Sequence, residues 1–308
     1  MLDTAVLLLS VAAATPQAPA PHPPVAFYVP ERVYDTASRT FVDFEVMLSR
    51  LKDADVIFVG EQHGDPNTHR LEAAVLDGLH RRQVVPVLSL EMLERDVQAN
   101  LDEYLAGRLT EEEMLKGQSS GPWKNYAADY RRMVEMAKLR GWTVVAANVP
   151  RRLANEVAKN GKDVIPAFSE TDRRYVAADL QCPLDDYFAR FKESMGSHPS
   201  GNKTPEEQAQ TMERYYWAQC VKDETMAESI ANAVQKRAGS PGPVVHYNGA
   251  FHTDFGLGTA ERVRRRLEGK KTVVLTMLPV ADLDSLAPAD DDLKRADFLV
   301  YTTTTPKQ

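Results

Sequence analysis

Six short runs of hydrophobic residues are spaced along the chain, and most of them are continuous rather than alternating with polar residues. They occupy positions 54–60, 84–92, 142–149, 243–249, 271–278 and 297–302. A continuous apolar run of this length is typical of a strand that is covered on both faces, as in a parallel sheet. The pattern therefore predicts six buried strands.

Segments with helical spacing lie between these runs. After the first run, Asp65 and Pro66 provide an N-cap followed by proline at the first helical position, and an apolar stripe continues to position 79. Helices are also expected at 130–140 and 259–267. Alternating strands and helices predict an α/β fold with a mostly parallel central sheet flanked by helices.

Two long helical stretches, 94–116 and 170–237, interrupt this alternation. The second contains many aromatic residues, most of which are expected to be core residues at helical spacing. We expect the two stretches to form a helical cap inserted between strands, covering about 94–118 and 170–237. The cap would belong to a single domain that spans 25–308.

Polar residues follow four of the predicted strands. In chain order they are Glu61 with His63, then Glu91, then Asn148 with Arg151, and then His252. Ligands of open parallel sheets bind beyond the carboxyl ends of the strands. An unpaired buried polar group costs about 1–3 kcal/mol, so these side chains are expected to share one polar site.

Each of these residues also has a structural explanation. Glu61 could stabilise the N-terminus of the following helix, and His63 could be a hydrogen-bonded loop histidine. Glu91 could pair with Arg151. A Gly-x-x-His pattern at two of the strand ends favours a function, because glycine allows close approach of the backbone.

Two chemistries suit Glu61, His63, Glu91 and His252. Two histidines with one or two carboxylates could bind a divalent metal that activates water. Alternatively, a carboxylate and an imidazole could act as base and orienting group in acyl transfer. The spacing does not choose between them, and a polar network that only supports the fold is a third explanation.

Composition and charge narrow the class of protein. The chain has 308 residues, 26% of them charged and 43% hydrophobic, which is typical of a soluble globular protein. A net charge of -7 disfavours a nucleic-acid partner. Two cysteines, Cys182 and Cys220, are too few for a disulfide scaffold; they could pair with each other or remain free thiols.

The N-terminal region has the features of an export signal. Residues 5–14 (AVLLLSVAAA) have the length of a signal-peptide core, and a stretch rich in proline and alanine follows at 16–24. Segment 1–24 is therefore expected to be a signal peptide with a leader, and the protein to be periplasmic or in the cell envelope. The residues before the apolar run include Asp3 and no lysine or arginine, which argues against a signal peptide. No cysteine follows the run, so a lipoprotein is not expected, and no later segment is apolar enough to cross a membrane.

Five motifs stand in order along the chain: GEQHGDPNTHRLE, SLEM, PWKNYAADYRRMVEMAKLRGWTVVAANVPR, AQCVKDETMAESI and YNGAFHTDFGLG. In these motifs and their order the chain resembles the ChaN family of haem-binding uptake proteins, which is similar to the wider Tiki, TraB and erythromycin-esterase superfamily. The resemblance covers about 33–302. The motif positions carried over are Gly60, Glu61, His63, Glu91, Trp123, Tyr126, Asn148, Arg151, Gly249 and His252.

The resemblance implies an α/β core with a helical cap and non-covalent haem binding in bacterial iron acquisition. It also implies a homodimer with haem at its interface, tyrosine ligation of the iron, and membrane-associated uptake machinery as a partner. The enzymatic branches of the superfamily use the equivalent Glu and His positions, so the alternative is a metal-dependent or Glu/His-assisted hydrolase acting through Glu61, His63, Glu91 and His252.

Ferric haem needs an apolar slot, an axial donor and cations for its propionates. The candidate donors are Tyr126, Tyr187, Tyr215 and Tyr216, and Arg151 is a candidate cation. Tyr126 belongs to one of the family motifs, and Tyr215 and Tyr216 lie beside the AQC segment. The sequence thus predicts a haem-binding protein without locating the iron.

Overall fold

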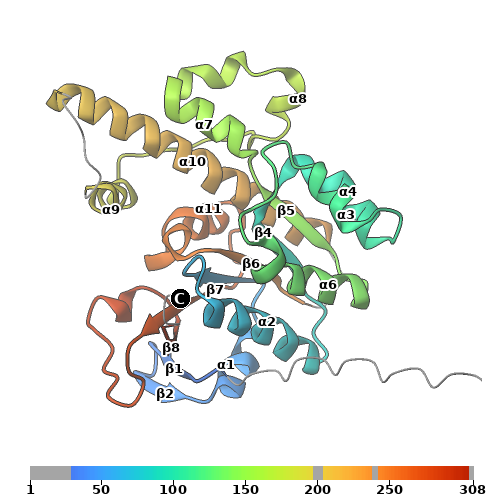
Figure 1. The fold of residues 1–308 in the computed structure, drawn as a ribbon. Coiled ribbons are helices and arrows are strands. Elements are labelled where there is room, and N and C mark those ends of the chain that lie inside the picture. The colour runs from blue at the N-terminus through green and yellow to red at the C-terminus, as the bar shows by residue number, and fades with distance from the viewer. Residues whose placement is uncertain (1–28, 197–203, 238–241, 305–308) are drawn as a thin grey trace, which may run out of the picture.

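A computed structural model describes residues 29–196, 204–237 and 242–304. An eight-stranded sheet crosses the molecule, and helices cover both of its faces (Figure 1). The strands lie in the order β2-β1-β8-β7-β3-β6-β4-β5. Their bounds are Glu31–Asp35 (β1), Thr40–Val42 (β2), Val56–Glu61 (β3), Val87–Glu94 (β4), Val144–Asn148 (β5), Val244–Gly249 (β6), Thr272–Val280 (β7) and Phe298–Thr303 (β8).

The six strands from β8 to β5 run parallel, which confirms all six strands expected from the apolar runs. A hairpin of β1 and β2 adds to β8 in the antiparallel sense, so the sheet is mixed. The hairpin was not expected from the sequence. Its strands are short and only partly buried at the sheet edge, so they contain no continuous apolar run.

The helices are α1 Phe44–Leu51, α2 Pro66–Arg81, α3 Gln98–Leu105, α4 Glu111–Lys116, α5 Tyr126–Asp129, α6 Arg131–Arg140, α7 Arg151–Asn160, α8 Glu170–Arg173, α9 Asp186–Met195, α10 Pro205–Lys236 and α11 Gly258–Arg266. Short 3-10 helices occur at η1 Arg95–Val97, η2 Lys162–Ala167, η3 Ala250–His252, η4 Asp254–Gly256 and η5 Asp292–Lys294. The expected N-cap is present, because Asp65 accepts a hydrogen bond from the backbone N–H of Thr68 at 2.8 Å.

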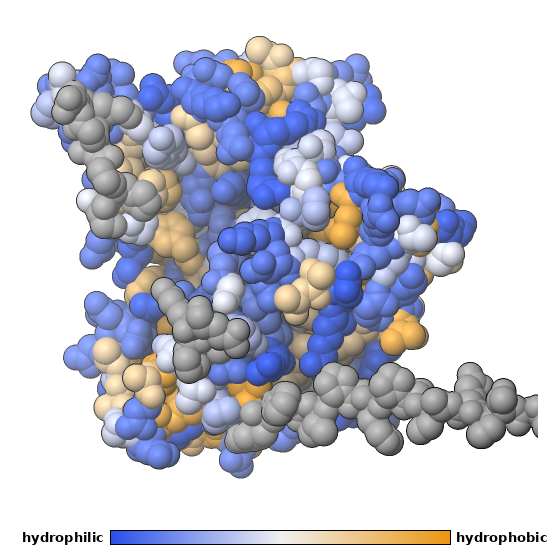
Figure 2. Space-filling view, viewed as in Figure 1, coloured by the Kyte–Doolittle hydropathy of each residue, from blue (hydrophilic) through white to orange (hydrophobic). Residues whose placement is uncertain are grey.

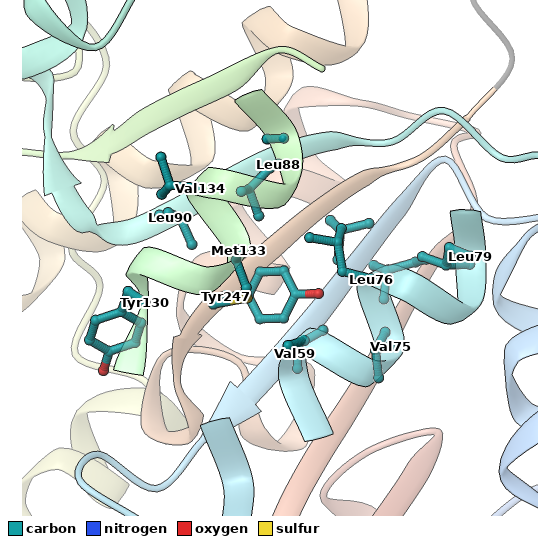
Figure 3. Close-up of a cluster of buried hydrophobic side chains, with 14 of the residues drawn as sticks. Val59, Val75, Leu76, Leu79, Leu88, Leu90, Tyr130, Met133, Val134 and Tyr247 are labelled. Carbon is teal, nitrogen blue, oxygen red and sulfur yellow. The ribbon is translucent and has the colours of Figure 1, made fainter. Parts of the chain in front are cut away.

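The central strand β3 is buried on both faces. Ile57 and Val59 belong to the cluster shared with α1, α2 and α6, part of which Figure 3 shows. Val56 and Phe58 belong to a second cluster, shared with α10 and α11. Each such side chain contributes about 1.5–3 kcal/mol through burial, which explains the continuous apolar run.

The structure does not confirm a helical cap inserted between strands. The C-terminal half of α10 packs flat on the sheet, where Ile230 and Val234 join the cluster of Phe58. In the earlier segment, β4 continues to Glu94, and α3 and α4 pack into the other cluster through Leu101 and Met114. Helical spacing alone does not distinguish a lid from a flanking layer. Figure 1 shows α9 and the first half of α10 extending away from the sheet.

Among the described helices, none has both the length and the apolar character needed to cross a membrane.

Candidate functional site

A cavity of about 670 Å³ lies at the carboxyl edge of the sheet, beyond the ends of β3 and β6. Strand ends contribute Glu61, His63 and His252 to its wall, and α9 contributes Tyr187 and Arg190. In Figure 2 the surface is hollowed between α9–α10 and the segment that follows β7. The expected location of the site, beyond the carboxyl ends of parallel strands, agrees with this cavity.

The first buried group of the site is the pair Glu61 and His63. Nδ1 of His63 is hydrogen-bonded to Oε1 of Glu61, and the hydroxyl of Tyr130 donates to the same oxygen at 2.7 Å. The Glu61 side chain is fully buried, whereas that of His63 is 45% exposed. The opposite ring edge of His63 faces the backbone of Gly249, and the ring lies 5.5 Å from that of Trp123. The strand end thus fixes the carboxylate, and the carboxylate orients the imidazole.

Charge stabilises this pair. Burial opposes ionisation of Glu61, but the hydrogen bond from His63 and the imidazole of His69, 3.3 Å away, hold the pKa of its carboxyl group well below the ordinary value. Burial also opposes protonation of His63, and its bond to Glu61 nevertheless raises the pKa of the imidazole. Glu61 is therefore ionised, and His63 is a stronger base than an ordinary histidine.

The second group consists of His252 between two carboxylates. Its Nδ1 lies 2.7 Å from Oδ1 of Asp223, and its Nε2 lies 3.3 Å from Oε1 of Glu91. Burial disfavours the imidazolium, but Glu91 and Asp223 raise the pKa of His252 to about 10. Likewise, the charge of His252 outweighs burial and lowers the pKa of Glu91 to about 2. All three groups are charged at neutral pH.

Hydrogen bonds fix the two carboxylates in place. The hydroxyls of Tyr187 and Thr259 each donate to Asp223 at 2.8 Å. The backbone N–H of Gly249 donates to Oε2 of Glu91 at 2.7 Å. The sequence analysis did not single out Asp223, although it lies in the AQCVKDETMAESI motif; its position 29 residues before His252 gives no indication of contact.

A third histidine, His69, lies behind the first pair and was also missed. Its Nδ1 is 2.9 Å from Oε2 of Glu72 and 3.3 Å from Oε2 of Glu61. Its Nε2 is 3.4 Å from Oδ2 of Asp129. Despite burial, Glu61 and Glu72 raise the pKa of His69 to about 10. Their spacing of three residues places His69 and Glu72 on one face of the expected helix, but such a polar pair usually faces solvent, so the spacing did not mark them as buried.

The structure brings Glu61, His63, Glu91 and His252 to one edge of the sheet, as the strand ends predict. Their catalytic role stays a prediction. Their donor atoms are not gathered as a group of three or more within 4.8 Å, a spacing that Glu61, His69 and Glu72 do satisfy among the described residues. Binding of a metal by the four residues therefore also stays a prediction.

The two residues expected from the third strand have local partners. Asn148 is buried, and its side-chain oxygen accepts a hydrogen bond from the backbone N–H of Val149. Arg151 donates to Oε1 of Glu94 at 2.8 Å, so the alternative pairing of Glu91 with Arg151 is wrong. The guanidinium of Arg151 lies 5.5 Å from the centre of the Trp123 ring, which connects it indirectly to His63.

The candidate tyrosines occupy different environments. Tyr126 is buried in the cluster beside α6, and burial raises the pKa of its hydroxyl. Tyr216 is buried and donates to the backbone oxygen of Pro183 at 2.8 Å, while Tyr215 is 41% exposed. None of these three lines the cavity; Tyr187 does, with its hydroxyl bonded to Asp223.

Cys182 and Cys220 are both free thiols, which is one of the two states that the sequence left open. They belong to the same apolar cluster as Tyr187 and Tyr216. Helix α9, which forms one wall of the cavity, therefore packs against the rest of the protein through this cluster.

The chain matches the family described as haem-binding uptake, Tiki superfamily, ChaN, over residues 47–263. Among solved structures it is similar to one described as cofacial haem binding to ChaN of Campylobacter jejuni, with a TM-score of 0.64 and 20% identity over 89% of this chain and 97% of that chain. A Bacillus cereus protein gives a TM-score of 0.47 and 11% identity over 84% and 91% of the two chains. A mutant form of the erythromycin esterase EreC gives a TM-score of 0.45 and 13% identity over 89% of this chain and 83% of that chain. No curated protein matches the chain.

Proposed function

Because the chain belongs to the ChaN family of haem-binding uptake proteins in the Tiki superfamily, we propose that it binds haem non-covalently and takes part in bacterial haem or iron uptake. The family match, which covers more than half of the chain, is the observation that carries this proposal. The fold of this chain is similar to that of the Campylobacter jejuni protein over nearly all of that protein's length.

The haem is proposed to bind in the cavity between the strand ends and α9. A volume of about 670 Å³ lies within the range of about 300–1,000 Å³ typical of small-molecule sites. Tyr187, Phe251 and Phe255 supply aromatic surface for a porphyrin face. Arg190 and Arg295 line the same cavity and could pair with the propionates.

Within this cavity, His63 is the proposed iron donor. Its half-exposed ring lines the cavity, and the carboxylate of Glu61 on Nδ1 increases the basicity of Nε2. Nε2 packs against the backbone of Gly249, so the ring would turn towards the cavity to bind the iron. The hydroxyl of Tyr187 already donates to Asp223. Among the tyrosines considered as iron ligands, Tyr215 is the one with an exposed side chain.

Export through segment 1–24, a homodimer and contact with uptake machinery remain part of the proposal. Segment 1–24 lies outside the described residues.

A hemin titration tests the proposal. The Soret band of hemin should shift and saturate at a fixed ratio of haem to protein. His63→Ala should weaken binding by at least about tenfold and change the band position, because a lost axial donor alters the iron spectrum. His80→Ala, on the far end of α2, is the matched control. An unsaturable titration would overturn haem binding, whereas a loss confined to Tyr215→Phe would assign the donor to Tyr215.

A hydrolase is the second candidate function, and the paired histidines favour it. Haem binding does not require His252 to be held between Asp223 and Glu91, or His63 to be held by Glu61. In such a site, His63 could take a proton from an attacking water molecule, and the imidazolium of His252 could stabilise the developing oxyanion.

This candidate is tested with a panel of ester and peptide substrates. Glu61→Gln and His252→Gln should each lower kcat by about 100-fold or more. His252→Gln should leave hemin affinity within a factor of about three, whereas Glu61→Gln should also weaken hemin binding, because Glu61 supports His63 as the proposed iron donor. Glu94→Gln, a buried carboxylate paired with Arg151, is the control. Turnover that persists unchanged in both variants would exclude this chemistry at these residues.

A further inference from the structure

Three buried side chains meet behind the cavity wall. Glu61 is at the end of β3, and His69 and Glu72 project from α2, with exposed fractions of 1%, 5% and 0%. One donor atom from each lies within 4.8 Å of the others. Within 29–196, 204–237 and 242–304, no other group of histidine, cysteine and acidic side chains has this spacing.

Two carboxylate oxygens in this group lack a hydrogen-bond partner. They are Oε2 of Glu61 and Oε1 of Glu72, and both are buried. The hydrogen bond of His69 goes to Oε2 of Glu72, so it satisfies neither oxygen. A buried acceptor without a partner costs about 1–3 kcal/mol, and more when it is charged. Either a bound cation or a proton shared between the two carboxyl groups would satisfy these oxygens.

The spacing and the charge of the group both suit a divalent ion. Nδ1 of His69 lies 3.3 Å from Oε2 of Glu61 and 2.9 Å from Oε2 of Glu72. Neighbouring ligands of an ion with bonds of about 2.1 Å are about 3 Å apart. Binding of the ion would displace the proton that His69 holds at neutral pH, and the two carboxylates would then carry the charge that a divalent ion neutralises.

The surroundings of the group match those of a metal site. The second ring nitrogen of a metal-binding histidine is usually held by a hydrogen bond. Nε2 of His69 accepts the backbone N–H of Gly64 at 3.2 Å and lies 3.4 Å from Oδ2 of Asp129. Ligating carboxylates are usually hydrogen-bonded as well, and Tyr130 donates to the other oxygen of Glu61 at 2.7 Å. A second layer of contacts therefore already orients two of the three ligands.

We propose that Glu61, His69 and Glu72 form a binding site for a divalent transition-metal ion behind the wall of the haem cavity, to which Glu61 also belongs. Mixed nitrogen and oxygen ligands suit Zn²⁺, Mn²⁺ or Fe²⁺, whereas Ca²⁺ takes six to eight oxygens. The bound ion holds Glu61 in its carboxylate form through Oε2. Because Oε1 of Glu61 is hydrogen-bonded to His63, the ion also fixes the orientation of the histidine that faces the cavity.

The experiment uses the full haem-free chain, treated with a chelator and then incubated with Zn²⁺, Mn²⁺ or Fe²⁺ in turn. We expect one equivalent of at least one ion to remain after gel filtration and to raise Tm. Glu72→Gln and His69→Gln should each weaken binding by at least about tenfold, since a ligand is lost. Glu94→Gln and His246→Gln change a buried acid and a buried histidine outside the group and should retain the ion.

Each result of these binding experiments either supports the proposed metal site or rejects it. Equal binding by the two ligand variants and the two controls would overturn the site, as would absence of a Tm shift with all three ions. If a ligand variant fails to fold, Co²⁺ titration of the unaltered chain replaces it. A visible absorption band that saturates at one equivalent supports the site, and a titration without such a band rejects it. Because no haem is present, failure here leaves the hemin titration unaffected.

Discussion

Nε2 of His63 lies so close to the backbone of Gly249 that a Cβ atom at position 249 would stand 2.7 Å from it. The contact joins the end of β3 to the end of β6, and it fixes the ring from the side opposite Glu61. Gly249 has φ -56° and ψ 133°, which any residue adopts. Here glycine provides room for an imidazole rather than an unusual backbone conformation.

Gly249→Ala should therefore displace His63 and leave the fold intact. The ring is half exposed and can turn into the cavity, so the free energy of unfolding should change by about 1 kcal/mol or less. Hemin affinity should fall by at least about tenfold if His63 is the donor. Gly196→Ala is the control, because its nearest contacts are backbone oxygens of α9 at 3.3 Å or more. Unchanged hemin spectra in Gly249→Ala would argue against a role of this ring.

Asp223→Asn should be strongly destabilising. It removes one of the two anions around the buried imidazolium of His252, and breaking such a pair costs roughly 3–5 kcal/mol. Urea unfolding at pH 7 measures the loss, with the exposed Asp53→Asn as a neutral control.

The stability lost in Asp223→Asn should become smaller as pH rises. The pKa of His252 is raised from 6.5 to about 10 on folding, so its charge contributes stability below pH 6.5 that disappears as pH rises through 10. The difference between Asp223→Asn and the unaltered protein should therefore narrow between those values. A difference that stays constant would mean that His252 is not charged in the folded protein.

The parallel sheet and the location of the site could be predicted from the sequence because they depend on local patterns. Each apolar run is a strand buried on both sides, and a polar residue at its end points to the carboxyl edge. Glu61, His63 and His252 were identified on this basis, and they line one cavity.

The supporting residues could not be found in this way, since their roles come from contacts between distant segments. Asp223 lies in the middle of α10 and reaches His252 only because that helix packs beside α11. His69 and Glu72 lie on an ordinary amphipathic helix, where a polar pair usually faces solvent. Long helices also gave no sign of whether they flank the sheet or cover its edge.

His246 should make the protein sensitive to acid. It is fully buried on β6, with Nδ1 hydrogen-bonded to Ser89 at 2.9 Å, and burial lowers its pKa from 6.5 to about 3. Between these values the unfolded chain binds a proton that the folded protein does not. Stability should therefore fall as pH drops from 6.5 to 3, by up to roughly 4 kcal/mol from this group.

His246→Asn tests this assignment by removing the titrating group while leaving an amide near Ser89. The variant should be less stable at pH 7, because the smaller side chain leaves a cavity, but its stability should depend less steeply on pH between 6.5 and 3. Chemical unfolding at several pH values gives both quantities. Parallel curves for the variant and the unaltered protein would place the acid sensitivity in other groups.

The hydroxyls of Tyr126 and Tyr216 should affect stability differently. The hydroxyl of Tyr126 is buried without a partner, so Tyr126→Phe should leave the free energy of unfolding unchanged or raise it by up to about 1 kcal/mol. Tyr216→Phe removes the hydrogen bond to the Pro183 oxygen and should cost about 1 kcal/mol. Urea unfolding of both variants measures these effects. Because neither hydroxyl lines the cavity, the hemin spectrum should not change in either variant. Loss of the Soret shift in one of them would instead make that tyrosine the iron ligand, as the family resemblance implies, and would require haem to bind outside the cavity.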